Sequence, residues 1–212
     1  MEEHIVRILE TEALTPDVKR YRVARPQGYQ FEPGQATEVA VKKSGWESES
    51  RPFTFTSRVK DPFLEFVIKS YRDHDGVTKQ LDTLVPGDEL LLHDVWGTIQ
   101  FAGPGLFIAG GAGITPFVAI FRALQEQGKV KGNRLLFANK TEADVILKAE
   151  WQNVLGADFH SLVGQFVTKE AISSLYRKGD KVYLCGPDPM MDAVRPILKS
   201  LGVGDDLLVV EL

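Results

Sequence analysis

Three short motifs in this chain combine residue types that bind nucleotides. The first, Arg51-Pro52-Phe53-Thr54, places a guanidinium, an aromatic ring and a hydroxyl on one extended segment. The second is a glycine-rich turn from Gly110 to Pro116, and the third is Cys185-Gly186-Pro187, which ends an apolar segment. Each motif alone is a weak signal. Their order and spacing together predict two dinucleotides held against one another, which is the arrangement that hydride transfer requires.

The first motif offers three kinds of contact to one flat ligand. On a strand, Arg51 and Phe53 point to one side and Thr54 to the other, so a ligand along the strand edge would meet all three. An arginine fork suits a diphosphate, an aromatic face suits a planar ring, and a hydroxyl can bond a ring nitrogen. The alternative interpretation is an edge strand with a solvated arginine and a phenylalanine in the core.

Gly76-Val77-Thr78 predicts a further anion contact. A glycine before a short helix leaves backbone N–H groups available, and Thr78 adds a hydroxyl, so an anion would be stabilised there. The alternative is an ordinary turn and helix cap.

The glycine turn follows an apolar run that starts at Phe107. Its glycines permit close backbone approach of a nucleotide, Thr115 fits a helix N-cap, and Pro116 fits the first helical position. Because Pro116 occupies the last glycine position, the full G-x-G-x-x-G fingerprint is not present. A purely structural glycine turn is the alternative.

The third motif ends the apolar run that begins at Val182. Ligands gather at the carboxyl ends of parallel strands, so we expect Cys185 to face the same crevice as Gly111. The alternative is a small, inert core residue, which is the usual role of a lone cysteine.

The elements that must position these motifs change character along the chain. The first hundred residues predict short strands separated by turns, with a short helix within residues 76–84, which indicates an antiparallel barrel or sandwich. The expected strands are His4–Glu10, Val18–Arg25, Thr37–Lys43, Pro52–Ser57, Leu64–Tyr71 and Glu89–Val95.

After residue 103, strands alternate with helices, which indicates a parallel sheet with crossover helices. The expected strands are Leu106–Ala109, Arg134–Asn139, Phe159–Val163, Lys181–Cys185 and Leu207–Glu211. Helices are expected at Pro116–Gln127, near Thr168–Tyr176 and at Pro189–Leu201, and the segment Ala143–Leu155 is expected to be largely helical. We therefore predict two domains, residues 1–102 and residues 103–212.

Composition narrows the function classes. A net charge of −4, with neither half net positive, argues against a broad surface for nucleic acid. One cysteine and four scattered histidines predict no disulfide, iron–sulfur cluster or other metal site. The N-terminus lacks the features of a signal peptide and no apolar stretch is long enough to span a bilayer, so a cytoplasmic location is expected.

Taken together, these motifs resemble the ferredoxin–NADP reductase superfamily, which includes flavodoxin and cytochrome reductases. The resemblance covers essentially the whole chain and extends to the turns Pro33-Gly34-Gln35 and Pro86-Gly87-Asp88. It implies an N-terminal six-stranded antiparallel FAD-binding β-barrel with one short helix. It also implies a C-terminal Rossmann-like nucleotide-binding domain with a five-stranded parallel sheet.

The resemblance implies an activity as well. Hydride would pass from NAD(P)H to bound FAD, and electrons would move onward to a separate acceptor such as a flavodoxin, a ferredoxin, a haem protein or free flavin. The choice of FAD over FMN rests on the family alone.

On the flavin side, the resemblance assigns a role to each motif residue. Arg51 would bind the FAD diphosphate, Phe53 would stack on the isoalloxazine, and Thr54 would bond its redox-active nitrogen. The remaining flavin contacts would be Pro52, Val67, Ile68, Lys69, Gly76, Val77 and Thr78.

On the nicotinamide side, Cys185 would lie beside the nicotinamide, and Glu211 resembles the near-terminal glutamate of the family. The predicted catalytic set is thus Thr54, Cys185 and Glu211. The nucleotide contacts would be Gly111, Gly113, Thr115, Pro116, Asn139, Lys140, Cys185, Gly186, Pro187 and Met190.

The segment Phe137–Glu142 resembles the NADH-using cytochrome reductases. It has no arginine for a 2′-phosphate and Glu142 would repel one, although Lys140 offers a positive charge. NADH is therefore slightly favoured over NADPH.

One other function class is kept as an alternative, and a second has little support from the residues present. A non-catalytic flavin subunit of a larger redox complex is the main alternative. A dehydrogenase acting on a carbon substrate would need an acid–base set that the nucleotide half does not show. Because neither half is net basic, strong attraction of an acidic ferredoxin is not expected, although Arg20, Arg22, Lys42, Lys43 and Arg58 are candidates for a local basic patch.

Overall fold

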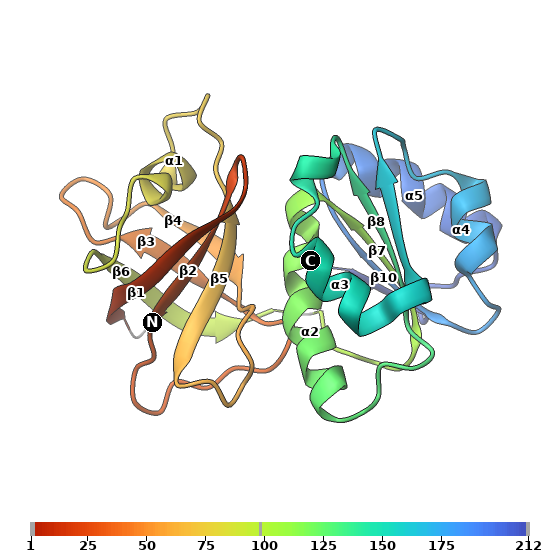
Figure 1. The fold of residues 1–212 in the computed structure, drawn as a ribbon, viewed down its shortest axis with the longest axis horizontal. Coiled ribbons are helices and arrows are strands. Elements are labelled where there is room, and N and C mark those ends of the chain that lie inside the picture. The colour runs from red at the N-terminus through yellow and green to blue at the C-terminus, as the bar shows by residue number, and fades with distance from the viewer. Residues whose placement is uncertain (1–2, 98, 211–212) are drawn as a thin grey trace.

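Two sheets built from separate halves of the chain lie side by side in the computed structural model, which describes residues 3–97 and 99–210 (Figure 1). The first is a six-stranded antiparallel barrel with one short helix, and the second is a five-stranded parallel sheet with helices. This architecture confirms the predicted fold class.

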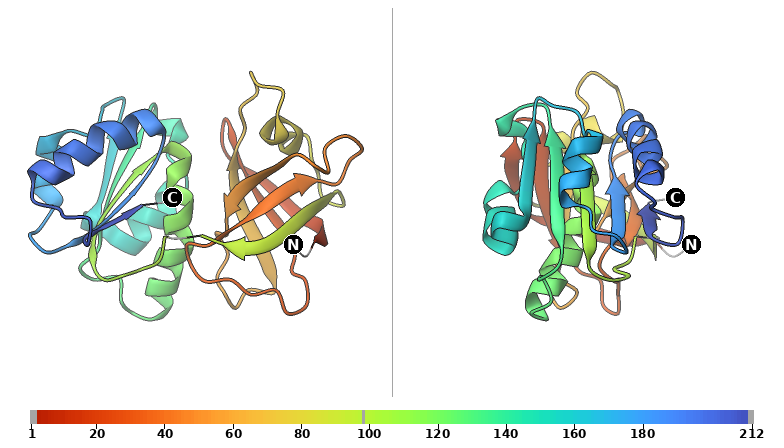
Figure 2. Two further views of the ribbon diagram at one scale, coloured as in Figure 1. Left: turned by 180° about the vertical axis from the view of Figure 1, so that it is seen from behind. Right: turned by 90° about the vertical axis from the view of Figure 1, so that its right-hand side faces the viewer.

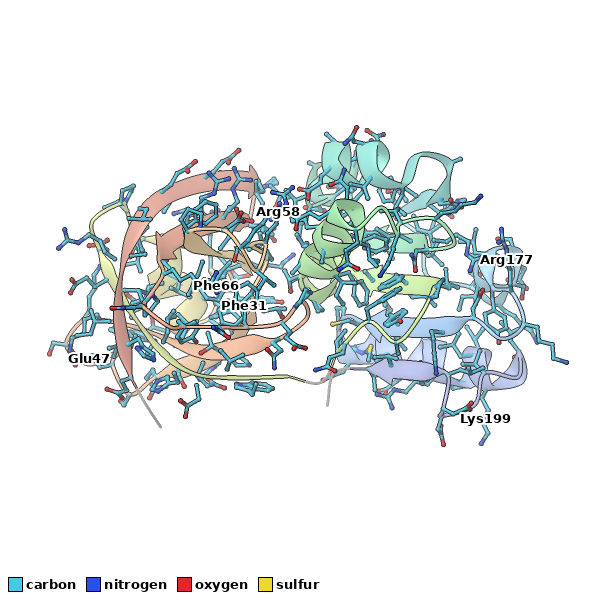
Figure 3. All side chains as sticks on the ribbon, turned by 90° about the horizontal axis from the view of Figure 1, so that it is seen from below. Phe31, Glu47, Arg58, Phe66, Arg177 and Lys199 are labelled. Atoms are coloured by element: carbon cyan, nitrogen blue, oxygen red, sulfur yellow. The ribbon has the colours of Figure 1, made fainter. Side chains whose placement is uncertain are left out.

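The barrel has the strand order β4-β3-β6-β1-β2-β5 and closes through a bridge between Phe55 and Phe66. Phe31 and Phe66 fill its interior, where Phe31 stacks on Phe55 at 4.4 Å between ring centroids (Figure 3). Its elements are β1 (His4–Thr15), β2 (Val18–Ala24), β3 (Ala36–Val41), β4 (Ser50–Thr54), β5 (Phe63–Lys69), α1 (Val77–Asp82) and β6 (Glu89–Trp96).

The apolar residues of the short helix α1 are spaced so that one face of the helix is buried. Val77 and Leu81 lie one turn apart and, with Leu84, are buried in the barrel core. The helix therefore plugs one end of the barrel with an apolar face.

The parallel sheet has the order β11-β10-β7-β8-β9, and helices cover both of its faces (Figure 2). Along the central strand β7, Phe107 packs into the core on one face and Ile108 into the core on the other. The strands are β7 (Gly105–Gly110), β8 (Arg134–Asn139), β9 (Phe159–Val163), β10 (Lys181–Cys185) and β11 (Leu208–Val210). The helices are α2 (Thr115–Glu126), α3 (Lys148–Leu155), α4 (Lys169–Leu175) and α5 (Asp188–Ser200).

Two sequence-based expectations need correction and one needs more detail. Strand β1 does not end at Glu10 but runs to Thr15, because register shifts let it bend while it pairs with β2. The segment Ala143–Leu155 is largely helical, as expected, but its 3₁₀ turn at Glu142–Asp144 is separated from α3 by Leu147, which has a φ of 56°. Finally, Thr115 is not the N-cap of α2, since the helix is preceded by a 3₁₀ turn and capped by Ile114.

Helix α2 lies between the barrel and the parallel sheet (Figure 1). Val18 and Val67 of the barrel join the same buried cluster as Phe117 and Phe121 of α2. The two halves therefore share a continuous apolar contact. Within the described residues, no helix is both long enough and apolar enough to cross a membrane.

Candidate functional site

A crevice of about 420 Å³ separates the barrel from the ends of the parallel strands. Its barrel side includes Pro52, Phe53, Thr54, Val67, Ile68, Lys69 and Thr78. Its other side includes Gly110, Ala112, Gly113, Thr115, Cys185, Gly186 and Pro187. Residues from all three sequence motifs therefore meet at one site, as their order and spacing predicted.

A second hollow of about 670 Å³ adjoins the crevice and shares Lys69, Gly110 and Pro187 with it. It extends the site along the carboxyl ends of β7 and β8. The predicted nucleotide residues that line it are Gly111, Asn139, Lys140, Pro187 and Met190.

Strand β4 presents the central barrel contacts. Thr54 is buried, with 7% of its surface exposed, and pairs with Ala36 of β3, while Phe53 pairs with Thr37. Phe53 lines the crevice and also packs against the barrel core. One face of its ring is thus fixed by the core.

Other predicted flavin residues lie differently. Arg51 is exposed, donates a hydrogen bond from Nη1 to its neighbour's carbonyl, that of Ser50, at 2.6 Å, and is not among the residues lining either hollow. The N–H of Gly76 donates to the carbonyl of His74 at 3.0 Å, so that amide is engaged within the turn. The Val77 side chain is in the barrel core, which leaves Thr78 as the member of this motif that reaches the crevice.

The glycine turn is shaped by its contact with the third motif. A Cβ on Gly113 would stand 2.4 Å from the carbonyl oxygen of Cys185, and one on Gly110 would stand 2.4 Å from Sδ of Met190. Gly111 has a φ of 51°, a left-handed conformation that favours glycine. These glycines bring the backbone of the turn directly against Cys185 and Gly186.

Helix α2 starts at the crevice. The hydroxyl of Thr115 donates to the carbonyl of Ala112 at 3.0 Å, and Thr115 itself lines the crevice. Pro116 is buried behind it in the first turn. The N-terminus of this helix can stabilise an anion, because its first backbone N–H groups and its dipole point outward.

Cys185 lies at the end of β10 in register with Ala109 of β7. It is buried, with 7% of its surface exposed, and lines the crevice. In the crevice it lies opposite the barrel with Gly110, Ala112 and Gly113 of the glycine turn, whereas Gly111, the residue named in the sequence prediction, lines the adjoining hollow.

Asn139 is the most informative polar residue of the second hollow. It is 8% exposed, and neither Nδ2 nor Oδ1 has a hydrogen-bond partner among the described residues. A buried amide without partners costs free energy, so a polar ligand in this hollow would satisfy it. With the glycine-lined approach and the start of α2, this supports the fit of a dinucleotide to the site.

The charge beside the site is held in place. Nζ of Lys69 lies 2.8 Å from Oδ2 of Asp17, and both residues line the second hollow. Burial tends to raise the pKa of Asp17, but Lys69, together with hydrogen bonds from Thr15 and the backbone, keeps that pKa below its usual range. A fixed ammonium suits a phosphate.

Sequence reasoning missed several lining residues, including Asp17, Tyr71, Trp96 and Phe166. Tyr71 and Trp96 come at or just after strand ends, which was the available signal. Phe166 is 92% exposed, and no pattern in the sequence marks it. The predicted catalytic residue Glu211 lies outside the described residues. No metal-binding group of three or more His, Cys, Asp or Glu occurs within residues 3–97 and 99–210.

Comparison with protein-family models finds an FAD-binding domain over residues 4–95 and an oxidoreductase NAD-binding domain over residues 107–162. The chain is 31% identical to NADH-cytochrome b5 reductase 1 of Mycosarcoma maydis, over 92% of this chain and 68% of that protein. It is 26% identical to the reductase component of propane 2-monooxygenase of Rhodococcus jostii (strain RHA1), over 94% of this chain. It spans 60% of the length of that reductase.

The fold matches that of a ferredoxin NADP+ reductase from Neisseria gonorrhoeae with bound FAD and NADP. The TM-score is 0.86 at 16% identity, and the match covers 99% of this chain and 98% of the other. At that identity the likeness concerns the fold, which agrees with the two family models.

Proposed function

This chain belongs to the ferredoxin–NADP reductase superfamily of FAD-dependent NAD(P)H oxidoreductases, and from that premise we propose that its crevice is where hydride passes from NAD(P)H to FAD. One observation carries the proposal: the barrel motif, the glycine turn and Cys185 line the same crevice. We place the domain boundary between residues 102 and 103, in the segment that joins β6 to β7.

The barrel side is proposed to hold FAD. Thr54 donates its hydroxyl to the flavin ring, Phe53 supplies an aromatic face, and Lys69 and Thr78 contact the phosphates and ribityl chain with the backbone of Val67 and Ile68. Arg51 reaches the diphosphate after giving up its bond to Ser50, since its side chain is exposed and free to turn. Pro52 completes this wall, and Gly76 and Val77 position Thr78 at the start of α1.

The opposite side is proposed to hold the nicotinamide nucleotide. Gly111 and Gly113 let the nucleotide approach the backbone closely, and Thr115 and Pro116 begin the helix that faces its phosphates. The side-chain amide of Asn139 forms hydrogen bonds with the nucleotide. Lys140, Gly186, Pro187 and Met190 line the rest of that subsite.

A bound nicotinamide and flavin supply the hydride donor and acceptor themselves. The chain's residues bind and align the two rings and exclude water from between them. Cys185, buried at the end of β10, lines the crevice and is proposed to lie beside the nicotinamide. Thr54 is proposed to donate a hydrogen bond to the flavin ring from the barrel side. Glu211 is proposed to assist hydride transfer.

We favour NADH over NADPH. Asp144 lines the second hollow, and its carboxylate would repel a 2′-phosphate bound there, as would that of Glu142, two residues earlier in the chain. Lys148 already pairs with Glu142. A ratio of kcat/KM values for the two cofactors tests this, and a preference for NADPH would overturn it.

The acceptor is proposed to be a separate redox partner: a cytochrome b5 or other haem protein, a ferredoxin, a flavodoxin, or free flavin. The candidate basic patch does not favour strong electrostatic attraction. Arg20, Arg22 and Arg58 are each paired with a glutamate, as is Lys42. Association with the acceptor should therefore depend weakly on salt.

Oxidation of NADH by the FAD-reconstituted chain, with ferricyanide as an artificial acceptor, tests the function. Turnover is expected, followed by selective reduction of one of the purified acceptor classes. Bound FAD without any NADH oxidation would favour the alternative, a non-catalytic flavin subunit of a larger complex.

A further inference from the structure

A buried ionic cluster joins the two domains about two turns along α2 from the crevice. Its centre is the guanidinium of Arg122 on α2, which lies between the carboxylates of Glu65 on β5 and Glu150 on α3. Nη1 donates to Oε1 of Glu65 at 2.7 Å and to the carbonyl of Thr56 at 2.7 Å. Nε and Nη2 donate to the two oxygens of Glu150 at 2.6 and 2.8 Å.

The hydrogen bonds of the cluster stabilise the buried, ionised carboxylate of Glu65. Glu65 is 2% exposed and also accepts hydrogen bonds from Thr56 Oγ1 at 3.1 Å and Arg22 Nε at 3.1 Å. Burial pushes the pKa of Glu65 upward, but the attraction of Arg122 and the bond from Arg22 outweigh it and keep that pKa below its usual range. A buried carboxylate so fully bonded tolerates few positions of its partner.

The elements that carry the cluster also carry the crevice. Glu65, Val67 and Lys69 are every second residue of β5 and therefore point to the same face of the strand. Val67 and Lys69 line the crevice about 7 and 13 Å along the strand from Glu65. Thr115, which also lines the crevice, lies seven residues before Arg122, or about 10 Å along α2. A change in the Arg122–Glu65 contact would therefore move both walls of the crevice relative to each other.

We propose that Arg122 is a positioning residue, and that its contacts with Glu65 and Glu150 set the spacing of the FAD and nicotinamide subsites. This inference rests on the proposed function and names a residue remote from both subsites. Rigid alignment matters because displacement of reacting groups by about 1 Å can slow a reaction roughly a hundredfold.

The test compares Arg122→Lys, which keeps the charge but loses the planar fork, with two matched controls. Arg134→Lys alters a buried ion pair with Asp180, 2.6 Å long, that lies wholly within the nucleotide domain. Glu126→Gln alters two exposed links from the same helix α2 to the barrel, 2.9 Å to Arg58 and 3.1 Å to Lys60 (Figure 3 shows Arg58 on the barrel side nearest α2).

Two readouts are needed. Residual dipolar couplings of the protein without nicotinamide nucleotide report the relative orientation of the domains, and stopped-flow absorbance reports the limiting rate of flavin reduction by NADH. Arg122→Lys is expected to broaden or rotate the domain orientation and to slow reduction roughly ten- to a hundredfold, with FAD affinity unchanged. Both controls are expected to keep the wild-type orientation and rate.

An unchanged orientation and rate in Arg122→Lys would overturn the inference, as would an equal loss in Arg134→Lys. Glu150→Gln, at a more exposed carboxylate, is a milder second variant if Arg122→Lys fails to fold, and the same outcomes apply to it. Wild-type protein that binds no FAD, or is not reduced by NADH, would instead refute the proposed function, while the dipolar couplings would still test the interdomain contact.

Discussion

The barrel side of the crevice and its nucleotide side are built in different ways. On the barrel side, the contacts come from within strands β4 and β5, where side chains such as Phe53, Thr54 and Lys69 form the surface. On the nucleotide side, the contacts come mostly from the ends of β7 and β10 and the turns that follow them. There Gly110, Gly113 and their neighbours bring the backbone to the surface.

This difference determines how each wall tolerates change. A strand side chain can be replaced while the barrel keeps its hydrogen-bond ladder, so such a change should affect binding or rate more than folding. A turn that packs backbone against backbone has no room for an added atom, so folding and binding should fail together.

The largest effect is expected for Gly113→Ala. The added Cβ would meet the backbone of Cys185 at 2.4 Å, so the turn must move. We expect the free energy of unfolding to fall by about 1–3 kcal/mol, with NADH affinity reduced more than tenfold, about 1.4 kcal/mol. Chemical denaturation and NADH titration measure both quantities.

Gly76→Ser is the control for that substitution. Gly76 has open space around its Cβ position and caps α1, where serine is well tolerated. Wild-type stability is expected. If Gly113→Ala is as stable as Gly76→Ser, the turn is not backbone-packed in the way described.

Asn139→Leu separates binding from folding on the nucleotide side. Because both amide atoms of Asn139 are buried without partners among the described residues, their removal should leave stability unchanged or raise it by about 1 kcal/mol. The added stability that NADH confers should fall, with about a tenfold loss of affinity. Thermal unfolding with and without NADH is the measurement, and a large loss of stability without ligand would show that Asn139 is structural.

Thr54→Val tests the barrel wall. Valine keeps the shape of the side chain and removes the hydroxyl, which costs one hydrogen bond to the flavin, about 0.5–1.5 kcal/mol. Flavin reduction should slow about two- to tenfold, and the unfolding free energy of the protein without FAD should change little. Unchanged reduction kinetics would remove Thr54 from the proposed catalytic set.

The smallest effect is a pH dependence that vanishes near neutral pH, and it concerns the Arg122–Glu65 contact that joins the two domains. The pKa of Glu65 in the folded protein lies below its ordinary value of 4.5, so its ionised form stabilises the fold above that value. That stabilisation is lost as the pH falls through the folded-state pKa. The difference in unfolding free energy between wild type and Glu65→Gln should be constant above about pH 6 and shrink in acid, as pH-dependent denaturation can show. A difference that grows in acid would contradict the assignment.

Much of this site follows from the sequence because strand ends in a parallel sheet share one edge. Gly113 and Cys185 are 72 residues apart, yet the alternation of strands and helices is sufficient to place them together. The spacing of Val77, Leu81 and Leu84 likewise predicted α1, since it follows the helical period.

The directions of side chains and the pairing of residues far apart in the chain could not be predicted from the sequence. The exposed position of Arg51, and the hydrogen bond from Thr115 to Ala112 in place of an N-cap, depend on local backbone geometry that no residue pattern fixes. The pairing of Arg122 with Glu65 depends on how the two domains pack, and each residue alone is an ordinary charged position in a helix or a strand.

The most direct test is the visible spectrum of the FAD-reconstituted protein before and after anaerobic addition of NADH and, separately, NADPH. The account predicts a bound-flavin spectrum that bleaches with either cofactor, and faster with NADH. Failure to bind FAD, or a bound flavin that neither cofactor bleaches, would contradict the claim that this crevice holds a hydride donor against a flavin.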